Sequence, residues 1–468
     1  MKHLDTLMEC CKKIAAFKWL PLIFFVSYRL VLDWTYVFFL VPIYGTTEFA
    51  YNPSFMSWLI SIAVAIIVFF LIYDDKATPS NFVLSMFLIV SYVPLSTYFA
   101  FSGRSPLYFL YVSFCWVLIK LIINFSFKKE LKFDWRKWMR PFIAIMESIK
   151  KRGTSVSKFL HIFILVFCLA NTVGFVVGTL LYRDLSGWLA LFDLGRVYEI
   201  RQDIVTPLWF GYVEVWQVFA INLFLTAYFI FIKKYPLASI PLILQLLHYF
   251  TTGVRASLFA IPFFIVFLIL SNFFKRPTLP LSASIGAGIA FTNVLVVFFR
   301  FGLTIFSLLV MRTIFMPVQI EYGYFEFFQE FPKLVFSEGR IGSLLGTVSP
   351  YPLSSHQMLT MTLYGTVNSN TNTGFFAAAF SDLGFAGMVL VAVLLAVVLK
   401  YCDVCFKKLP LFILIPAIIT PFFIMTNGSF FTVMLTNGLG VQLFLFTLLA
   451  LAVSLKQNDS ETPTEEGD

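Results

Sequence analysis

The sequence predicts an all-α polytopic membrane protein with about twelve transmembrane helices. Of its 468 residues, 59% are hydrophobic and only 13% are charged, and long apolar runs recur from end to end. A helix needs about twenty apolar residues to cross the hydrocarbon core of a bilayer, and these runs have that length. A soluble chain of this size would alternate apolar and polar faces along its elements, and this chain does not.

The apolar runs place twelve predicted spans along the chain. The N-terminal segment is too charged for the apolar part of a signal peptide, and the first run is long enough to remain as a span, so no cleaved signal is expected. The predicted spans lie near residues 17–42, 54–73, 80–100, 106–126, 158–181, 211–232, 236–252, 256–273, 280–308, 373–400, 409–425 and 430–454.

Lysine and arginine accumulate in connections that twelve spans would place on one side of the membrane. The excess of these residues marks the cytoplasmic side, so both termini are expected there. The net charge of +9 is spread over these connections, and no nucleic-acid partner is expected. The basic connections contain Lys2, Lys12, Lys13, residues 127–157, Lys233, Lys234, Lys275, Arg276, Lys407 and Lys408.

This orientation divides the chain into four predicted regions. The first, 1–310, is a membrane domain with nine spans and an outer loop at 182–210. Residues 311–372 form a large extracytoplasmic loop, and three further spans occupy 373–455. The acidic segment 456–468 is expected to be a disordered cytoplasmic tail, because its composition cannot bury an apolar core.

The large loop is the polar segment on which the function is expected to depend. Ile320, Tyr324, Phe327, Phe328 and Phe331 recur at helical spacing, which predicts an amphipathic helix in the membrane interface that Pro332 ends. Aromatic residues beside amides favour a sugar-binding cleft, although a solvated loop without a ligand has a similar composition. The candidate sugar-binding residues are Tyr364, Asn368, Asn370 and Asn372.

The predicted outer face is rich in arginine and carries one lysine, Lys333. Arginine offers a planar fork that binds phosphate through two hydrogen bonds, which favours a lipid-linked phosphate or pyrophosphate as ligand. Arginines at helix ends that reach toward the interface without a ligand are the alternative. The candidate phosphate-binding residues are Arg201, Arg255, Arg312 and Arg340.

His356 is the one histidine in the predicted outer loops, and it is a candidate proton acceptor for an attacking hydroxyl. Carboxylates compete for that role, among them Asp382, which lies within a predicted span where a charge is costly. The outer loops show no metal-ligand motif and no phosphate-binding glycine loop, so the chemistry is expected to need neither a metal nor a cofactor. The competing carboxylates are Glu321, Glu326, Glu330, Glu338 and Asp382.

Three features together resemble the Wzy-type oligosaccharide repeat-unit polymerases. They are Arg255 after Thr251-Thr252-Gly253, the loop that opens at Arg312 with Pro317 nearby, and the segment NTGFFAAAFSDLGFAG. The resemblance implies a GT-C-like glycosyltransferase of the bacterial inner membrane that builds O-antigen in lipopolysaccharide, or capsule. It would transfer a glycan from undecaprenyl pyrophosphate onto the next lipid-linked repeat unit, with inversion and without a metal. A chain-length regulator and a flippase are its expected partners.

Two other functions stay open at this point. A flippase for lipid-linked oligosaccharides, or another transporter, would also have about twelve spans and buried arginines, but transporters tend to show internal repeats. The two halves of this sequence show no repeat, and a long outer loop suits an enzyme better. An O-antigen ligase would share the architecture and most of the candidate residues.

Overall fold

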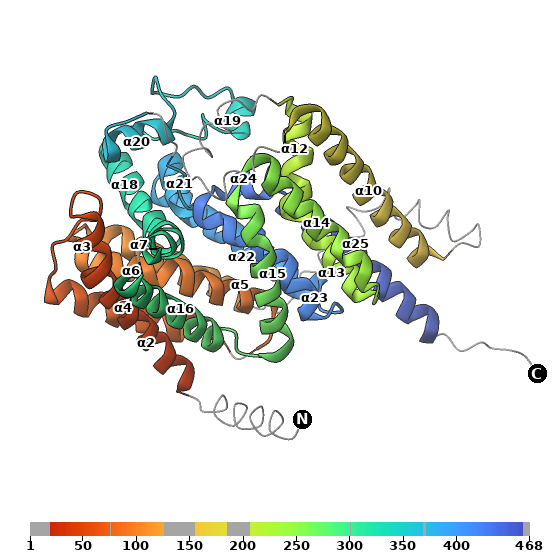
Figure 1. The fold of residues 1–468 in the computed structure, drawn as a ribbon, viewed down its shortest axis with the longest axis horizontal. Coiled ribbons are helices and arrows are strands. Elements are labelled where there is room, and N and C mark those ends of the chain that lie inside the picture. Colours follow the sequence, from red (N-terminus) through yellow and green to blue (C-terminus); the bar gives the residue numbers. More distant parts are fainter. Residues whose placement is uncertain are drawn as a thin grey trace, which may run out of the picture. The chain divides into compact units, whose positions relative to one another are not determined.

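The computed structural model describes residues 19–74, 76–125, 155–184, 206–299, 301–367 and 371–461. Within these ranges every regular element is a helix, and no strand occurs (Figure 1). The predicted class, an all-α polytopic membrane protein, is confirmed. The basic connection after the fourth predicted span and most of the first outer loop lie outside the described residues.

The first half of the described chain consists of long helices, several of them interrupted by a π-helical turn. These turns lie at Tyr36–Leu40 (η1), Leu88–Tyr92 (η2) and Gln217–Ile221 (η4). The helices are α2 (Leu20–Thr35), α3 (Val41–Tyr44), α4 (Phe55–Ile72), α5 (Pro79–Phe87), α6 (Val93–Ser102), α7 (Pro106–Asn124), α10 (Val156–Tyr182), α12 (Leu208–Trp216), α13 (Asn222–Phe231), α14 (Tyr235–Thr252) and α15 (Arg255–Phe273).

The second half alternates long helices with short ones. It contains one long π-helical segment, η5 (Ser307–Phe315), and one 3-10 turn, η6 (Met425–Asn427). The helices are α16 (Thr278–Phe298), α17 (Gly302–Phe306), α18 (Met316–Glu330), α19 (Arg340–Leu345), α20 (Ser355–Tyr364), α21 (Phe375–Leu383), α22 (Phe385–Cys405), α23 (Leu411–Ile424), α24 (Phe430–Leu435) and α25 (Leu439–Glu461).

Eleven helical stretches among the described residues are long and apolar enough to cross a membrane. Two predicted spans, 236–252 and 409–425, are not among them. The first is helical as α14, but buried polar residues such as Gln245 and His248 lower its hydropathy. The second is the shorter apolar helix Leu411–Asn427. The stretch Gly302–Glu330, in contrast, meets the criteria, although most of it was predicted to belong to the outer loop.

Two compact units make up the described chain, and each is considered by itself. Unit 1 comprises Met1–Ile122, Phe274–Val397 and Met425–Phe430. Unit 2 comprises Ile123–Phe273, Val398–Ile424 and Phe431–Asp468. The predicted division at residues 310 and 372 follows the chain in order, whereas the units interleave distant segments.

Unit 1 has two ends that its hydrogen bonds define. At one end, which we call the start end, the first residue of α16 lies beside α5, because the hydroxyl groups of Ser85 and Thr278 lie 2.7 Å apart. At the opposite end, the loop end, the backbone N–H of Asn52 donates to the carbonyl of Phe101 at 2.8 Å. Helices α3 and α6 finish at this loop end, and α7 begins there.

The stretch formed by α17, η5 and α18 lies across the loop end of unit 1. Phe306 packs on Tyr44 near its beginning, with ring centroids 6.5 Å apart. Near its other end, Phe325 packs on Tyr108, two residues into α7, at 5.2 Å. Both contacts lie at the same end of unit 1, so this stretch does not pass through the unit from one end to the other. The predicted segment is helical as α18, and its residues Pro317 to Phe325 are all buried.

The helix bounds differ from the predicted loop in two places. Arg312 was predicted to open the loop but lies inside the helical segment η5, and the chain leaves helical geometry after Glu330. The predicted disordered tail begins at 456, whereas α25 continues to Glu461. The apolar residues before Pro332 continue the helix toward the N-terminus as far as η5, which explains why Arg312 is helical.

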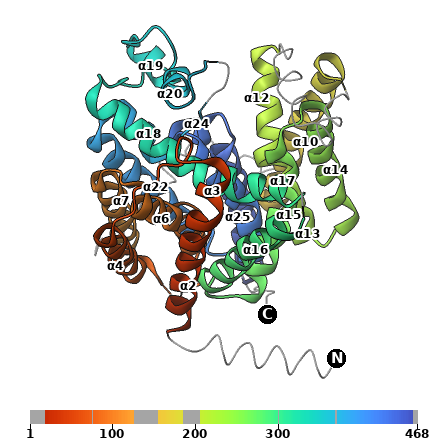
Figure 2. The ribbon, with the colours of Figure 1, turned by 60° about the vertical axis from the view of Figure 1, so that its left-hand side comes forward.

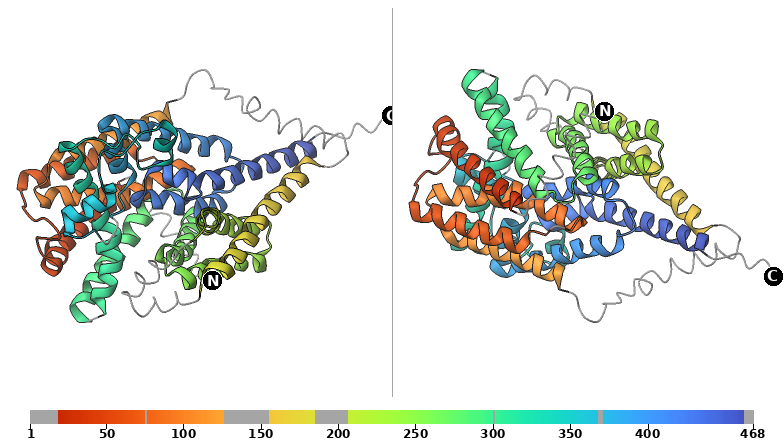
Figure 3. Two further views of the ribbon diagram at one scale, coloured as in Figure 1. Left: turned by 90° about the horizontal axis from the view of Figure 1, so that it is seen from above. Right: turned by 90° about the horizontal axis from the view of Figure 1, so that it is seen from below.

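Unit 2 packs its helices around buried polar side chains. Helices α10 and α25 approach each other toward the beginning of α10 (Figure 3), where the Ser157 hydroxyl donates to the carbonyl of Ala452 at 2.9 Å. An amide chain continues inside the unit: Gln217 donates to Asn222 at 2.7 Å, and Asn222 donates to Gln245 at 2.9 Å. Buried amides need such partners, because water cannot reach them.

Candidate functional site

Helix α18 carries three of the candidate carboxylates, Glu321, Glu326 and Glu330. Pro317, its second residue, suits a helix start because the first N–H groups of a helix have no partner within the helix. The helix ends at Glu330, shortly before Pro332. Figure 2 shows α18 with α20 and α19 in the same part of unit 1. Glu321 and Tyr324 are both buried: Tyr324 contacts His356 and Thr371, and Glu321 lies beside Tyr108 and Gly374.

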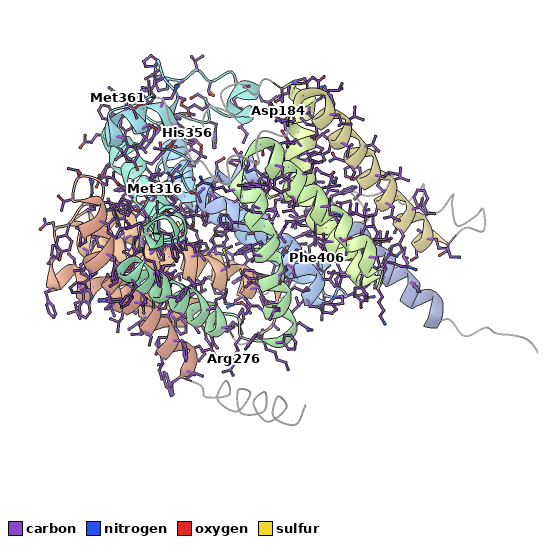
Figure 4. All side chains as sticks on the ribbon, in the orientation of Figure 1. Asp184, Arg276, Met316, His356, Met361 and Phe406 are labelled. Carbon is purple, nitrogen blue, oxygen red and sulfur yellow. The ribbon has the colours of Figure 1, made fainter. Side chains whose placement is uncertain are left out.

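His356 lies near the start of α20 (Figure 4) and is half-buried. The helix begins there because Ser354 and Gln357 form a reciprocal capping box. The Nδ1 atom of His356 lies 2.9 Å from the carbonyl oxygen of Thr371 and 2.8 Å from the hydroxyl of Tyr324. The imidazole is therefore held by two elements that are distant in sequence, α18 and the segment before α21.

The hydrogen bonds assign the ring proton of neutral His356 to Nδ1. A carbonyl oxygen can only accept, so the contact with Thr371 requires a donating Nδ1–H. The Tyr324 hydroxyl donates its own proton to the same carbonyl at 3.3 Å, so it too can accept from Nδ1. This arrangement leaves the lone pair of Nε2 available, and a neutral imidazole in this tautomer can accept a proton there.

Glu321 is buried, with 6% of its surface exposed. Its Oε2 atom accepts a hydrogen bond from Tyr108 at 3.2 Å, and it forms no ion pair with any residue that the structure describes. A Cβ atom built on Gly374 would overlap the Glu321 carboxylate, so this glycine allows the chain to pass beside it. As a base for a bound substrate, Glu321 is less accessible than His356.

Asp382 is half-buried near the end of α21 and holds a strained turn. Its Oδ1 atom accepts from the backbone N–H of Phe336 at 2.9 Å. Val335 and Phe336 both have positive φ angles, 50° and 61°, which bulky residues rarely adopt. Burial raises the pKa of Asp382 to about 6, although the hydrogen bond from Phe336 lowers it and Glu338 raises it further. The geometry gives Asp382 a structural partner.

The other carboxylates proposed as bases also have defined environments. Glu338 accepts from the backbone N–H of Ser355 at 2.6 Å and from its hydroxyl at 2.5 Å, so it holds the start of α20. Glu326 forms an ion pair with Arg104, and about a third of each side chain is exposed. Glu330 is exposed at the end of α18. Two of these three carboxylates are therefore already engaged.

The candidate arginines fall in different parts of the structure. Arg312 is exposed in η5 and forms no ion pair with the described residues. Arg340 begins α19, but its side chain lies outside the described part, as does the whole of Arg201. Arg255 begins α15 in unit 2 and is half-buried. The structure thus describes the surroundings of Arg312 and Arg255, each within its own unit.

The candidate sugar-binding residues are described in part. Tyr364 is the last residue of α20, and its hydroxyl is buried without a hydrogen-bond partner among the described residues. Burial raises the pKa of this hydroxyl, and Glu48 raises it further. Asn372 is exposed, whereas Asn368 and Asn370 lie outside the described residues. A buried hydroxyl without a partner is unusual, and a bound polar group would satisfy it.

Sequence reasoning missed the residues that join these candidates. Tyr324 was noted for its apolar spacing, but its hydroxyl holds His356 and Thr371. Tyr108 was not singled out, although it is the hydrogen-bond partner of Glu321. The helical spacing of Glu321 and Tyr324 was the available signal, since residues three apart lie on one helix face. Both side chains come from α18, so this helix is the centre of the candidate site.

Comparison with known proteins found no match to this chain, neither among protein-family models nor among curated proteins or solved structures. The fold and the candidate site therefore rest on the chain's own residues.

Proposed function

We propose that this chain is a membrane glycosyltransferase of the oligosaccharide repeat-unit polymerase kind, acting on glycans linked to undecaprenyl pyrophosphate. The observation that carries the proposal is the orientation of His356. Its Nδ1–H is directed at the Thr371 carbonyl at 2.9 Å, which leaves Nε2 able to take a proton from a sugar hydroxyl. The multi-pass helical architecture supports a substrate anchored in the bilayer.

In the proposed reaction, His356 acts as the general base. The acceptor hydroxyl gives its proton to Nε2 as its oxygen attacks the anomeric carbon of the donor glycan. The bond between that carbon and the phosphate oxygen breaks, and its electron pair leaves with the pyrophosphate. Attack from the face opposite the leaving group inverts the anomeric configuration.

Arginine side chains are the proposed partners of the leaving pyrophosphate. The exposed guanidinium of Arg312 has no carboxylate partner among the described residues, so it can offer its planar fork to a phosphate. Arg201, Arg255 and Arg340 are the further candidates. Losing one such donor typically costs about 3 kcal/mol of transition-state stabilisation.

Replacing His356 tests the proposed base. In cells that lack the native gene, His356→Ala should reduce polymer formation by about 10²- to 10⁴-fold, because general-base catalysis contributes that much. Tyr324→Phe should cause a smaller loss, since it removes one of the two contacts of Nδ1. Thr362→Ala is the matched control, because Thr362 is exposed on the same helix. Parental polymer length in the His356→Ala cells would remove this residue from the site.

Replacing Arg312 tests the phosphate partner. Arg312→Lys keeps the charge but loses the planar fork, and it should abolish most of the polymer if the fork binds phosphate. Arg276→Lys makes the same change in the connection before α16, at the start end of unit 1. Unchanged polymer in both variants would favour the alternative in which Arg312 only reaches toward the interface.

Transport of a lipid-linked glycan is the second candidate, and helix breaks favour it. Helix α21 has only nine residues, and the apolar helix after Pro410 changes to a 3-10 turn at Met425. Transporters often bind substrates at such discontinuous helices. Gene deletion separates the two functions: single capped units without polymer indicate a polymerase, whereas the loss of single units as well indicates a flippase or a ligase.

A further inference from the structure

The buried carboxyl group of Glu321 lies between two helix breaks of unit 1. On one side is the start of α21, where Gly374 caps the helix without any side-chain hydrogen bond. On the other is the turn η6, whose Thr426 carbonyl oxygen would lie 3.1 Å from a Cβ atom on Gly374. That same Cβ atom would overlap the Glu321 carboxylate. The Oε1 atom of Glu321 and the carbonyl oxygen of Thr426 therefore both lie next to Gly374.

The two breaks offer opposite hydrogen-bonding groups. The first N–H groups of a helix point outward without partners in the helix, and they attract an anion. At the start of α21 these groups belong to Phe375, Phe376 and Ala377, which are all buried. A carbonyl oxygen such as that of Thr426 accepts a hydrogen bond and repels an anion. The Glu321 carboxyl group can donate to the Thr426 carbonyl only when it is protonated, whereas the N–H groups of α21 attract it most strongly when it is ionised.

The cost of burial requires a partner for a charged Glu321. An ionised carboxylate in an apolar interior is expensive unless a cation or several donors compensate it. Among the described residues the Tyr108 hydroxyl donates to it at 3.2 Å, and no basic side chain forms an ion pair with it. A proton on Glu321 removes this cost, and the Thr426 carbonyl then becomes its natural acceptor.

We propose that Glu321 is a proton-binding site whose hydrogen-bond partners differ between its neutral and its ionised state. In the neutral state it donates a hydrogen bond to the Thr426 carbonyl and accepts one from Tyr108. In the ionised state it turns to the N–H groups at the start of α21. The segment before α21 also carries Thr371, the residue that orients His356, so proton binding at Glu321 would shift the residues next to the loop.

Other titratable and charged groups lie on α18 and on the elements packed against it. Tyr322 follows Glu321 and has a buried hydroxyl without a hydrogen-bond partner among the described residues. The η6 turn contributes no titratable side chain. The remaining groups are Tyr98 of α6, Arg104 after α6, Tyr111, Cys115 and Lys120 of α7, Arg312 of η5, Tyr324, Glu326 and Glu330 of α18, His356 and Tyr364 of α20, and Asp382 of α21.

Infrared spectroscopy of the full-length protein in lipid nanodiscs tests the proton directly. At pH 8 the parent protein should show the C=O stretching band of a protonated carboxylic acid, and Glu321→Gln should remove it. Asp382→Asn is the matched control, since Asp382 has a pKa of about 6 and is almost fully ionised at this pH. Tyr108→Phe should shift the frequency of the band without removing it, because it removes one hydrogen bond to the carboxyl group.

Identical spectra of the parent and Glu321→Gln proteins would overturn the proposal, because they would show an ionised carboxylate. Loss of the band on adding sodium chloride would also overturn it, since the site would then bind a metal cation. Partner exchange is tested by the labelling rate of Asn372→Cys, an exposed position two residues before Gly374. Thiol labelling itself speeds up with pH as the thiolate forms, so the rate is divided at each pH by that of a free thiol with the same reagent. We expect this ratio to change with pH, and to become independent of pH once Glu321→Gln is added. An unchanged pH response in that double variant would contradict the exchange.

Discussion

Two buried glutamates, one in each unit, solve the same physical problem in different ways. In unit 2, Glu214 accepts from Arg183 through Nε at 3.0 Å and Nη2 at 2.5 Å, and His248 lies 3.7 Å away. In unit 1, Glu321 accepts from Tyr108 and forms no ion pair with the described residues. Burial of a carboxylate can thus be compensated by a fixed cation or by a proton.

The difference has a consequence for each unit. A two-point ion pair between α10 and α12, with side chains 5% and 8% exposed, fixes both helices and has little freedom to change. A carboxyl group beside two helix breaks can gain or lose a proton, and its partners change with it. The first arrangement suits a scaffold, and the second suits a part of the protein that moves.

The largest expected effect compares the same substitution at both glutamates. Glu214→Gln leaves Arg183 buried without its counter-charge, and it should lower the free energy of unfolding by about 3–5 kcal/mol. Glu321→Gln leaves no uncompensated charge and should change it by less than about 1 kcal/mol. Unfolding in detergent, followed by tryptophan fluorescence, measures both. Equal losses would mean that Glu321 has an ionic partner after all.

A smaller effect is expected from crowding the Glu321 carboxylate. Gly374→Ala places a methyl group on that carboxylate, so the neighbouring helices must shift, at a cost of about 1–3 kcal/mol. Gly288→Ala in α16 is the control, because a Cβ atom there meets nothing within 4 Å. A stable Gly374→Ala variant with parental infrared bands would show that the two elements can separate freely.

The charge of Glu321 also sets the size of a third effect. Tyr108→Phe removes one hydrogen bond, which contributes about 0.5–1.5 kcal/mol to a neutral acceptor and about 1.5–3 kcal/mol to a charged one. For Tyr108→Phe we expect a loss of stability in the lower of these two ranges, measured by thermal unfolding at neutral pH. Tyr111→Phe, whose ring packs on Phe385 at 4.3 Å, controls for the loss of a hydroxyl on the same helix. A loss in the upper range would contradict a neutral Glu321.

Asp382 is an intermediate case, with a backbone N–H as its partner. Its pKa is raised from 3.8 to about 6, so the folded state binds the proton more tightly than the unfolded state does. Its contribution to stability is therefore present below about pH 4 and is lost as the pH rises to about 6. Asp382→Asn should remove this part of the pH dependence of the unfolding temperature. If the unfolding temperature of Asp382→Asn still falls with pH over this range, another group is responsible for the pH dependence.

Much of the fold could be predicted because membrane helices are specified locally. Apolar composition and length are read along the chain, and most predicted spans coincide with helices of the structure. The exceptions are instructive: α14 carries buried Gln245 and His248, whose partners come from other helices. The Gly302–Glu330 stretch reads as a span by composition, yet its contacts place it across the loop end of unit 1.

Composition and the length of the apolar runs predict the helical membrane class, and they show which types of residue are present to build a site. His356, Glu321 and Asp382 were identified because histidine and carboxylates carry proton chemistry wherever they lie. Only the tertiary structure decided their partners: the Thr371 carbonyl for His356, Tyr108 for Glu321 and the Phe336 N–H for Asp382. These partners are 15, 213 and 46 residues away in the chain, and local composition carries no information about such contacts.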